Sequence, residues 1–444
     1  MKRYSEYKDS GVKWIGEIPG HWKITTLKRH CKVNTGGTPS MSESRFYESP
    51  TIPWFTPGDL SENLKLSDST RKLSKTVIKE GVCKLFPINT VYFVGIGATV
   101  GKVGYSEHSA YCNQQINALI PYDINYKYLT YYLVFCKPEI VRIASASTLP
   151  IINQSKTGNI PLIELSIPEQ EAIVTYLDTK VAKIDEYISI AEKKIAALEE
   201  LKQTIIAEAV TRGIHKDVPM KDSGVKWIGM IPEHWDLKRA QNIVESRKAG
   251  AWGEDSRNDE RDRVCLRIAD FDYSICRFKR TGDYTIRNYK QEQISSLYLN
   301  KGDILIEKSG GGEKTPVGRA ILYDLDFYQP LYANFMEKIT LREFASSSFY
   351  VYLLRTFYAK GCVWKYIKQT TGLQNLDLRT MLGSETFPVP PLSEQQEIVT
   401  YIEAKVANIN QLCQAERSQI EKLKEYKQRL ISDVVTGKVK VTND

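Results

Sequence analysis

The chain contains one helix-like segment twice. Residues 169–185 and 394–410 agree at 10 of 17 positions, at an offset of 225 residues. A second segment, at residues 8–22, returns at 221–235 with 13 of 15 residues identical. Agreement in two separate segments predicts a tandem repeat, in which each copy has a short linker, a middle domain and a long helix.

Apolar residues in the repeated helices follow a heptad step, which favours pairing with another helix. Because a large domain adjoins each helix, we expect the two copies to pair antiparallel. Glu416 at a core position, and Lys202 close to one, are expected at solvated ends of the coil or at contacts with another subunit. The first seam comprises Leu177, Val181, Ile184, Ile188, Ala191, Ile195 and Leu198, continuing through Leu201, Ile205 and Ala209 with a local slip. The second comprises Ile402, Val406, Ile409, Cys413, Glu416, Ile420, Leu423, Leu430 and Val434.

Composition indicates a soluble, cytoplasmic protein. The chain has 61 Lys and Arg against 53 Asp and Glu, a net charge of +8 that tolerates a polyanionic partner without requiring one. Its eight cysteines are widely separated and its five histidines have no metal-site spacing, so we expect reduced thiols and no metal. No signal peptide and no run of about 18 apolar residues is present, which predicts no membrane association.

The repeat divides the chain into six segments. The linkers, each with the motif K-W-I-G-x-I-P-x-H-W, are expected to be ordered, with their indoles packed against other parts of the chain. The predicted segments are 1–22 (linker), 23–166 (middle domain 1), 167–212 (helix 1), 213–235 (linker), 236–391 (middle domain 2) and 392–444 (helix 2 and tail).

The middle domains share landmarks but differ in content. Each has a strand that enters a glycine-rich loop, and residues 99–102 of the first loop match 316–319 of the second. Tyr111–Asn113 is matched with Tyr332–Asn334, whereas Arg247–Arg263 has no evident counterpart. Nearly duplicated linkers and helices around two divergent middle domains are expected if the middle domains bind two different things.

Catalytic and nucleotide-binding motifs are missing. The loop G-I-G-A-T-V-G-K has too few residues before Gly101-Lys102 for a nucleotide phosphate loop, and Val103 occupies the position of the magnesium-binding Ser or Thr. The chain has no amino-methyltransferase motif of the N-P-P-Y type and no helicase box. We therefore expect no catalysis by this chain alone.

Glycine-rich turns with basic and amide side chains suit DNA, since backbone amides and cations contact phosphates and amide side chains read base edges. Each residue taken singly also has an ordinary role in a turn, a cap or a solvated surface. Equivalent loops in two repeated halves favour DNA, because a pseudo-dimer reads two half-sites. The candidates are Thr35, Gly36, Gly37, Thr38, Thr99, Lys102, Asn113, Gln114, Gln115, Lys308, Ser309, Gly310, Gly311, Lys314, Arg319, Asn334 and Gln374.

Taken in order, these motifs resemble the DNA-specificity subunits of type I restriction-modification systems. The resemblance rests on the paired linkers, N-T-G-G-T-P-S with I-P-W-F-T-P-G-D-L, C-N-Q-Q, K-S-G-G-G-E-K-T-P-V-G-R, and P-V-P-P-L-S-E-Q-Q-E-I-V at 388–399. It implies an α+β fold: two tandem α/β target recognition domains joined by two long helices that form an antiparallel coiled coil with pseudo-two-fold symmetry.

The resemblance also implies partners. Double-stranded DNA with a split recognition sequence would bind the middle domains, two methyltransferase subunits would dock on the frame, and two motor-nuclease subunits can join them. S-adenosylmethionine, ATP and magnesium would belong to those partners. Two rival hypotheses remain: a coiled-coil scaffold whose middle domains bind protein, and a self-sufficient methyltransferase or nuclease.

Overall fold

The computed structural model describes residues 3–144, 150–370 and 372–441. The chain forms two compact units. Unit 1 comprises residues 1–192 and 417–444, and unit 2 comprises residues 193–416. Each unit therefore takes one middle domain together with a portion of both long helices, α4 (Ile167–Arg212) and α9 (Leu392–Val435).

Unit 1 is built on an antiparallel sheet in the order β4-β10-β7-β8, with α2 packed on β7 and β8. A smaller sheet, β6-β5-β9, includes a parallel pairing of β5 with β9. The main strands are β4 (Cys31–Thr35), β10 (Ile116–Pro121), β7 (Thr90–Val94) and β8 (Val103–Ser106). The others are β1 (Tyr7–Asp9), β2 (Glu17–Pro19), β3 (Lys23–Thr26), β5 (Ile52–Phe55), β6 (Lys72–Leu73), β9 (Tyr111–Cys112) and β11 (Pro161–Glu164). The shorter helices are α1 (Thr76–Lys79), α2 (Tyr126–Ala144) and α3 (Gln154–Gly158).

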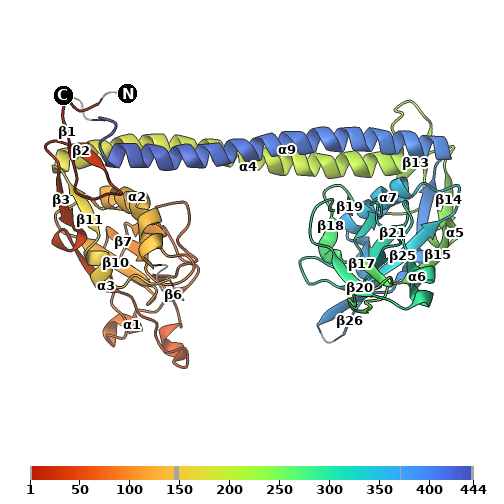
Figure 1. Ribbon diagram of the computed structural model, residues 1–444, viewed down its shortest axis with the longest axis horizontal. Helices are drawn as coiled ribbons and strands as arrows, with labels where there is room; N and C mark the ends of the chain where they lie inside the picture. Colours follow the sequence, from red (N-terminus) through yellow and green to blue (C-terminus); the bar gives the residue numbers. More distant parts are fainter. Residues whose placement is uncertain (1–2, 145–149, 371, 442–444) are drawn as a thin grey trace. The chain divides into compact units, whose positions relative to one another are not determined.

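Unit 2 repeats this plan with a longer sheet, β15-β25-β21-β23-β19-β18, and a second sheet, β16-β20-β17-β24 (Figure 1). The first sheet consists of β15 (Val244–Ala249), β25 (Met336–Leu341), β21 (Ile304–Glu307), β23 (Ala320–Leu322), β19 (Arg277–Phe278) and β18 (Phe271–Asp272). The second consists of β16 (Glu254–Asp255), β20 (Thr285–Asn288), β17 (Asp262–Leu266) and β24 (Leu331–Tyr332). The remaining strands are β12 (Met220–Asp222), β13 (Met230–Pro232), β14 (Asp236–Arg239), β22 (Ser309–Gly310), β26 (Ile367–Thr370), β27 (Leu373–Leu376) and β28 (Thr386–Val389). The helices are α5 (Ala240–Ile243), α6 (Gln291–Leu297), α7 (Ser347–Ala359) and α8 (Leu378–Ser384).

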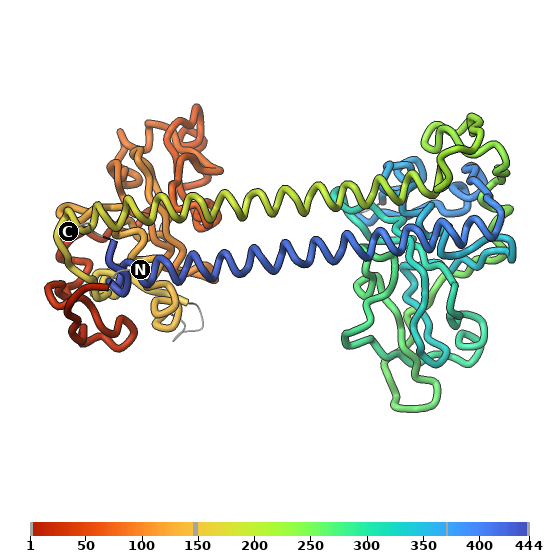
Figure 2. Tube along the Cα trace, turned by 90° about the horizontal axis from the view of Figure 1, so that it is seen from above, coloured from red at the N-terminus to blue at the C-terminus, as the bar shows by residue number. Residues whose placement is uncertain are grey.

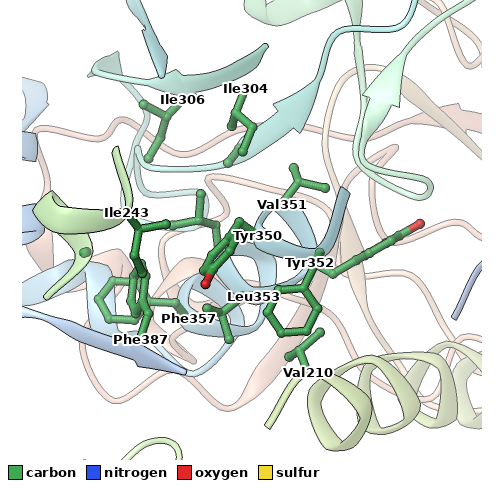
Figure 3. Close-up of a cluster of buried hydrophobic side chains, with 14 of the residues drawn as sticks. Val210, Ile243, Ile304, Ile306, Tyr350, Val351, Tyr352, Leu353, Phe357 and Phe387 are labelled. Carbon is green, nitrogen blue, oxygen red and sulfur yellow. The ribbon is translucent and has the colours of Figure 1, made fainter. Parts of the chain in front are cut away.

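The core of unit 2 joins the middle domain to α4. Figure 3 shows Val210 of α4 beside Tyr352 and Leu353 of α7, with Ile304 and Ile306 of β21 on the other side of that helix. All five side chains are buried. Burying a large apolar side chain contributes roughly 1.5–3 kcal/mol, so this cluster holds the end of α4 firmly against the domain.

Each linker forms a small hairpin that closes onto the start of a long helix. In unit 1 the Trp22 indole donates to the Glu169 carboxylate over 3.0 Å, and His21 lies 2.8 Å from the same oxygen. In unit 2 the contacts recur between Trp235, His234 and Glu394 at 3.0 and 2.8 Å. A carboxylate in the first turn also suits the positive end of the helix dipole. The predicted packing of the linker indoles is confirmed, since Trp22 and Trp235 are fully buried.

Within each unit, α4 and α9 run side by side in opposite directions (Figure 1, Figure 2). In unit 1, Lys427 near the end of α9 donates to Asp185 in the first half of α4. In unit 2 Lys202 meets Asn410, and Lys194 meets Glu416. The predicted antiparallel pairing is confirmed.

One predicted seam residue is wrong. Leu201 is 48% exposed, and Lys202 takes the seam position with 1% exposure, so the heptad step continues without a slip at this point. Lys202 and Glu416 also lie inside the helix pair, where each has an ion pair or hydrogen bond, and not at its ends. Leu201 was expected in the seam because it is apolar. Lys202 occupies the seam in its place, since a lysine can bury its aliphatic stem when its ammonium has a partner.

None of the described helices is long and apolar enough to cross a membrane. All eight cysteines are buried free thiols.

Candidate nucleic-acid interface

Two turns of unit 1 are held together at the ends of their strands. Backbone N–H groups of Gly36 and Gly37 donate to the carbonyl oxygens of Ile116 and Cys112, at 3.1 and 2.9 Å. A Cβ atom on Gly36 would lie 2.1 Å from the carbonyl oxygen of Cys112. The close approach requires glycine, and it brings residues 35–38 next to residues 113–115.

Polar side chains link these turns. The Thr38 hydroxyl donates to Gln114 in a short hydrogen bond, and Asn113 Nδ2 donates to Gln115 Oε1 over 3.0 Å. Thr35 donates to Asn117 Oδ1 over 3.0 Å. Thr38 and Gln114 are exposed. The turn therefore presents preorganised hydroxyl and amide groups of the type that bind base edges and phosphates.

The glycine-rich loop of unit 1 packs beside the same turns. Gly95 N–H donates to the Gln115 carbonyl over 2.8 Å, and Gly101, with φ +87°, donates to Val94 over 3.0 Å. The backbone carbonyl of Thr99 accepts from the backbone N–H of Lys102. The side chains of both residues are half-buried. We name residues 35–38, 95–102 and 113–115 rim 1.

Unit 2 builds the same arrangement from different residues. Gly250 and Ala251 donate to the carbonyls of Met336 and Tyr332, each over 3.0 Å, as Gly36 and Gly37 do in unit 1. A Cβ on Gly250 would lie 2.4 Å from the Ala333 carbonyl oxygen. The backbone N–H groups of Lys308 and Ser309 both donate to the carbonyl oxygen of Phe335, at 2.8 and 3.2 Å. We name residues 249–252, 308–319 and 333–335 rim 2.

The register of the strands corrects one predicted match. Asn113 donates its backbone N–H to Phe55, and the same bond in unit 2 runs from Ala333 to Leu266. Asn113 is therefore equivalent to Ala333, and Gln114 to Asn334, so the predicted match is wrong by one residue. The match of 99–102 with 316–319 is confirmed, because Lys102 and Arg319 make the same backbone bond to the preceding strand.

Sequence comparison also missed part of rim 2. Residues 249–251 were expected to have no counterpart, yet β15 pairs with β25 as β4 pairs with β10, and Gly250 takes the place of Gly36. Trp252 and Phe335 then occupy the places of Thr38 and Gln115. A tryptophan between two glycines, Gly250 and Gly253, was the available signal.

Arg319 is bound inside its own unit. Its Nε and Nη2 donate to the two carboxylate oxygens of Glu307 over 2.8 and 2.5 Å, and its guanidinium lies 3.8 Å from the ring centre of Tyr273. Burial lowers the pKa of Arg319, but the hydrogen bond and charge of Glu307 outweigh it and raise that pKa. Val94 occupies the place of Glu307 in unit 1, so Lys102 has no carboxylate at that position.

Gln374 was also predicted to bind DNA, and in the structure its side chain hydrogen-bonds to the backbone of the glycine-rich loop of unit 2. It is 1% exposed, its Oε1 accepts from the Val317 N–H over 3.2 Å, and its Nε2 donates to the Gly312 carbonyl over 3.4 Å. Ser309 donates to Asn375 over 2.6 Å, and Lys314 is exposed. Gly310 and Gly311 have φ of +115° and +64°, which favours glycine in this turn.

An aspartate fixes the turn that follows β5 in unit 1 and the turn that follows β17 in unit 2. Asp59 Oδ2 accepts from the Thr56 N–H over 2.8 Å, and Asp270 Oδ2 accepts from Arg267 over 2.7 Å in the same way. Burial raises the pKa of Asp59, but hydrogen bonds from Thr70 and Thr56 outweigh burial and lower that pKa. The carboxylate therefore stays charged and the turn stays rigid.

The structure thus brings together 35–38 with 113–115 in unit 1, and 308–311 with Asn334 and Gln374 in unit 2. Within residues 3–144, 150–370 and 372–441, no group of three His, Cys, Asp or Glu could hold a metal ion. The rims offer backbone amides, hydroxyls, amides and cations, which suit binding of a polar polyanion.

Comparisons with known proteins agree with this reading. A family model described as the type I restriction modification DNA specificity domain matches the chain twice, at residues 19–200 and 232–422. The MjaIX type I restriction enzyme specificity subunit of Methanocaldococcus jannaschii is 24% identical, over 98% of this chain and 97% of that protein. The EcoKI specificity subunit of Escherichia coli is 19% identical, over 96% and 90%. A solved chain from a study of assembly and conformational transition of the type I restriction-modification system superposes with a TM-score of 0.68, at 14% identity, covering 94% of this chain and 98% of that one.

Proposed function

Because the chain belongs to the family of type I restriction-modification DNA specificity domains, we propose that each of its two middle domains reads one half of a split DNA target. The observation that carries this proposal is the pair of rims. Both are built by the same backbone bonds around Gly36 and Gly250, yet they display different side chains. A shared frame with different exposed groups is what two readers of different half-sites require.

The phosphate and base contacts are assigned by side-chain chemistry. Exposed amides and hydroxyls of rim 1, at Thr38 and Gln114, suit base edges, and Lys102 suits a phosphate. In rim 2, Asn334 is exposed at the position of Gln114, and Lys314 is an exposed cation of the glycine-rich loop. Arg319 and Gln374 hold the loop in shape, which makes them positioning residues for the neighbouring backbone amides.

The chain directs chemistry that other subunits perform. Two methyltransferase subunits bind the frame formed by the linkers and long helices, and they methylate adenine in the target. Two motor-nuclease subunits can join them for cleavage of unmethylated DNA. S-adenosylmethionine, ATP and magnesium bind those subunits, and this chain is non-catalytic.

Methylome sequencing of the host, with and without the gene for this chain, tests the proposal. We expect methylated adenines at one two-part sequence in the first strain and none at that sequence in the second. An unchanged methylome, together with no salt-dependent DNA binding by the chain and its methyltransferase subunits, would contradict the proposal and favour a protein-binding scaffold.

A further inference from the structure

Two large aromatic side chains lie exposed on rim 2. Trp252 is 42% exposed and Phe335 is 45% exposed. The equivalent residues of rim 1 are Thr38 and Gln115, which are polar. Single exposed apolar residues are common on protein surfaces, but here both fall on the turns that the proposed function assigns to base reading. The two rims therefore differ in chemistry as well as in sequence.

The indole of Trp252 is held in place from one side. The guanidinium of Arg287 lies 4.8 Å from its ring centre. Arg287 is itself anchored, since it forms a short ion pair with Asp255 and donates to the carbonyls of Gly253 and Trp252 at 3.2 and 3.4 Å. The Arg287 side chain is only 16% exposed. A fixed cation against the ring orients the indole while much of it faces solvent.

Phe335 is positioned by its backbone. Its carbonyl accepts from the N–H groups of both Lys308 and Ser309, so the turn cannot rotate without breaking two hydrogen bonds. Its neighbours Ala333 and Met336 are buried, and Met336 donates to Ala333 over 3.0 Å. The exposed ring thus projects from a rigid turn, and it is not part of a flexible loop.

Apolar side chains on a DNA-reading surface have one specific target. In the major groove the base pairs present hydrogen-bond donors and acceptors, and only thymine adds an apolar group, its 5-methyl. An amide such as Gln115 suits a donor and acceptor pair, whereas an indole or phenyl ring suits a methyl. We propose that Trp252 and Phe335 are specificity residues of middle domain 2, and that they contact thymine methyl groups in its half of the target.

This inference rests on the proposed function, and its test is built to separate the two. The full chain is assembled with its methyltransferase subunits, and its affinity is measured for duplexes that carry the unmethylated target identified by methylome sequencing. Each thymine is then replaced in turn by uracil, which removes the methyl and leaves the pairing edge unchanged. A buried methyl is worth about 0.8 kcal/mol, so wild-type protein should lose about fourfold in affinity at the contacted thymines.

The variants Trp252→Ala and Phe335→Ala should each bind thymine and uracil duplexes equally at one such position. Both side chains are exposed, so their truncation leaves no core cavity. Tyr328→Ala is the matched control, because Tyr328 is 78% exposed and its ring centre lies 5.1 Å from the guanidinium of Arg263. Tyr328 lies before β24, whereas residues 333–335 of rim 2 lie after that strand, and it belongs to none of the three segments of rim 2. This control should keep wild-type discrimination.

The outcomes are distinct. Absence of any preference for the target over unrelated DNA in the wild-type complex would contradict the proposed function itself. Specific binding with no loss at any uracil, or unchanged discrimination in both variants, would overturn only the methyl contact. An equal loss of affinity for all sequences in the variants would also overturn it, and would indicate stacking on bases without sequence readout.

Discussion

Lys427 places its ammonium 2.7 Å from Oδ1 of Asp185 at the seam of α4 and α9 in unit 1. The same contact recurs in unit 2, where Lys202 lies 3.1 Å from Oδ1 of Asn410. An offset of 225 residues relates each lysine to the other, and Asp185 to Asn410. Lys427 and Lys202 are 8% and 1% exposed. Such buried polar pairs specify register, because a shifted helix would take Asp185 and Asn410 away from the two ammonium groups and leave Lys202 with only Glu199 of its own helix.

Replacing Asp185 by Ala should therefore destabilise unit 1 by about 1 kcal/mol. The expected loss of stability is small because the Asp185 side chain is 44% exposed. The double variant Asp185→Ala with Lys427→Met should recover most of the loss, since no buried charge then remains. Urea unfolding followed by helical circular dichroism measures both. If the double variant were as unstable as Asp185→Ala, burial of Lys427 would not be the cause.

Glu169 makes the stability of unit 1 depend on pH. Burial raises the pKa of Glu169, but hydrogen bonds from Trp22, His21 and Ser166 outweigh it and hold that pKa below its ordinary value of 4.5. A carboxyl group whose pKa is lower in the folded state stabilises the fold at pH values above its unfolded-state pKa of about 4.5. This stabilisation is lost as the pH falls through the folded-state pKa. We expect the urea midpoint of the wild type to fall more steeply below about pH 4.5 than that of Glu169→Gln. Glu171→Gln, at an exposed neighbour, should follow the wild type; equal slopes in all three proteins would exclude this role.

Arg319→Ala should lower the stability of unit 2 by about 3 kcal/mol, because it leaves the carboxylate of Glu307, which is 2% exposed, without its cation. Lys102→Ala, at the equivalent position of unit 1, should leave stability almost unchanged and weaken DNA binding at low salt. Thermal unfolding and filter binding separate the two effects. Equal thermal shifts in the two variants would contradict the distinction between a positioning arginine and a contacting lysine.

Gly36→Ala should cost about 3 kcal/mol or prevent folding of rim 1, since its Cβ would lie 2.1 Å from the Cys112 carbonyl oxygen. Gly58→Ala is the matched control, because its Cβ would lie 3.8 Å from the nearest atom, the Thr56 hydroxyl. We expect near wild-type stability and target affinity from that control. Crystal structures or thermal melts of both variants check this prediction, which a stable Gly36→Ala protein with an intact rim would refute.

Much of the frame could be predicted because its residues repeat. Identity between the two helices and their heptad step predict that the copies pair, and the large domain that adjoins each helix favours the antiparallel direction. Position 201 was misjudged because periodicity was read from apolar residues alone, and a buried Lys202 carries no such signal. Its partner Asn410 is 208 residues away, a distance that local patterns do not reveal.

The rims could be predicted only in part. The glycines at 36 and 37 were evident as a turn, and the structure places them against residues 112 and 113. Gly250 was missed because the residues around it diverged, while the backbone bonds that define its place were retained. The partners of Arg319 and Gln374 are set by strand pairing far along the chain, so the sequence could name these side chains but not their roles.

The most direct test of the account is exchange of residues 236–391 for the second middle domain of an unrelated specificity subunit, followed by methylome sequencing. The repeated frame and the separate rims predict a new two-part target in which one half is unchanged and the other half is that of the donor. A target in which both halves changed would contradict the assignment of one half-site to each middle domain.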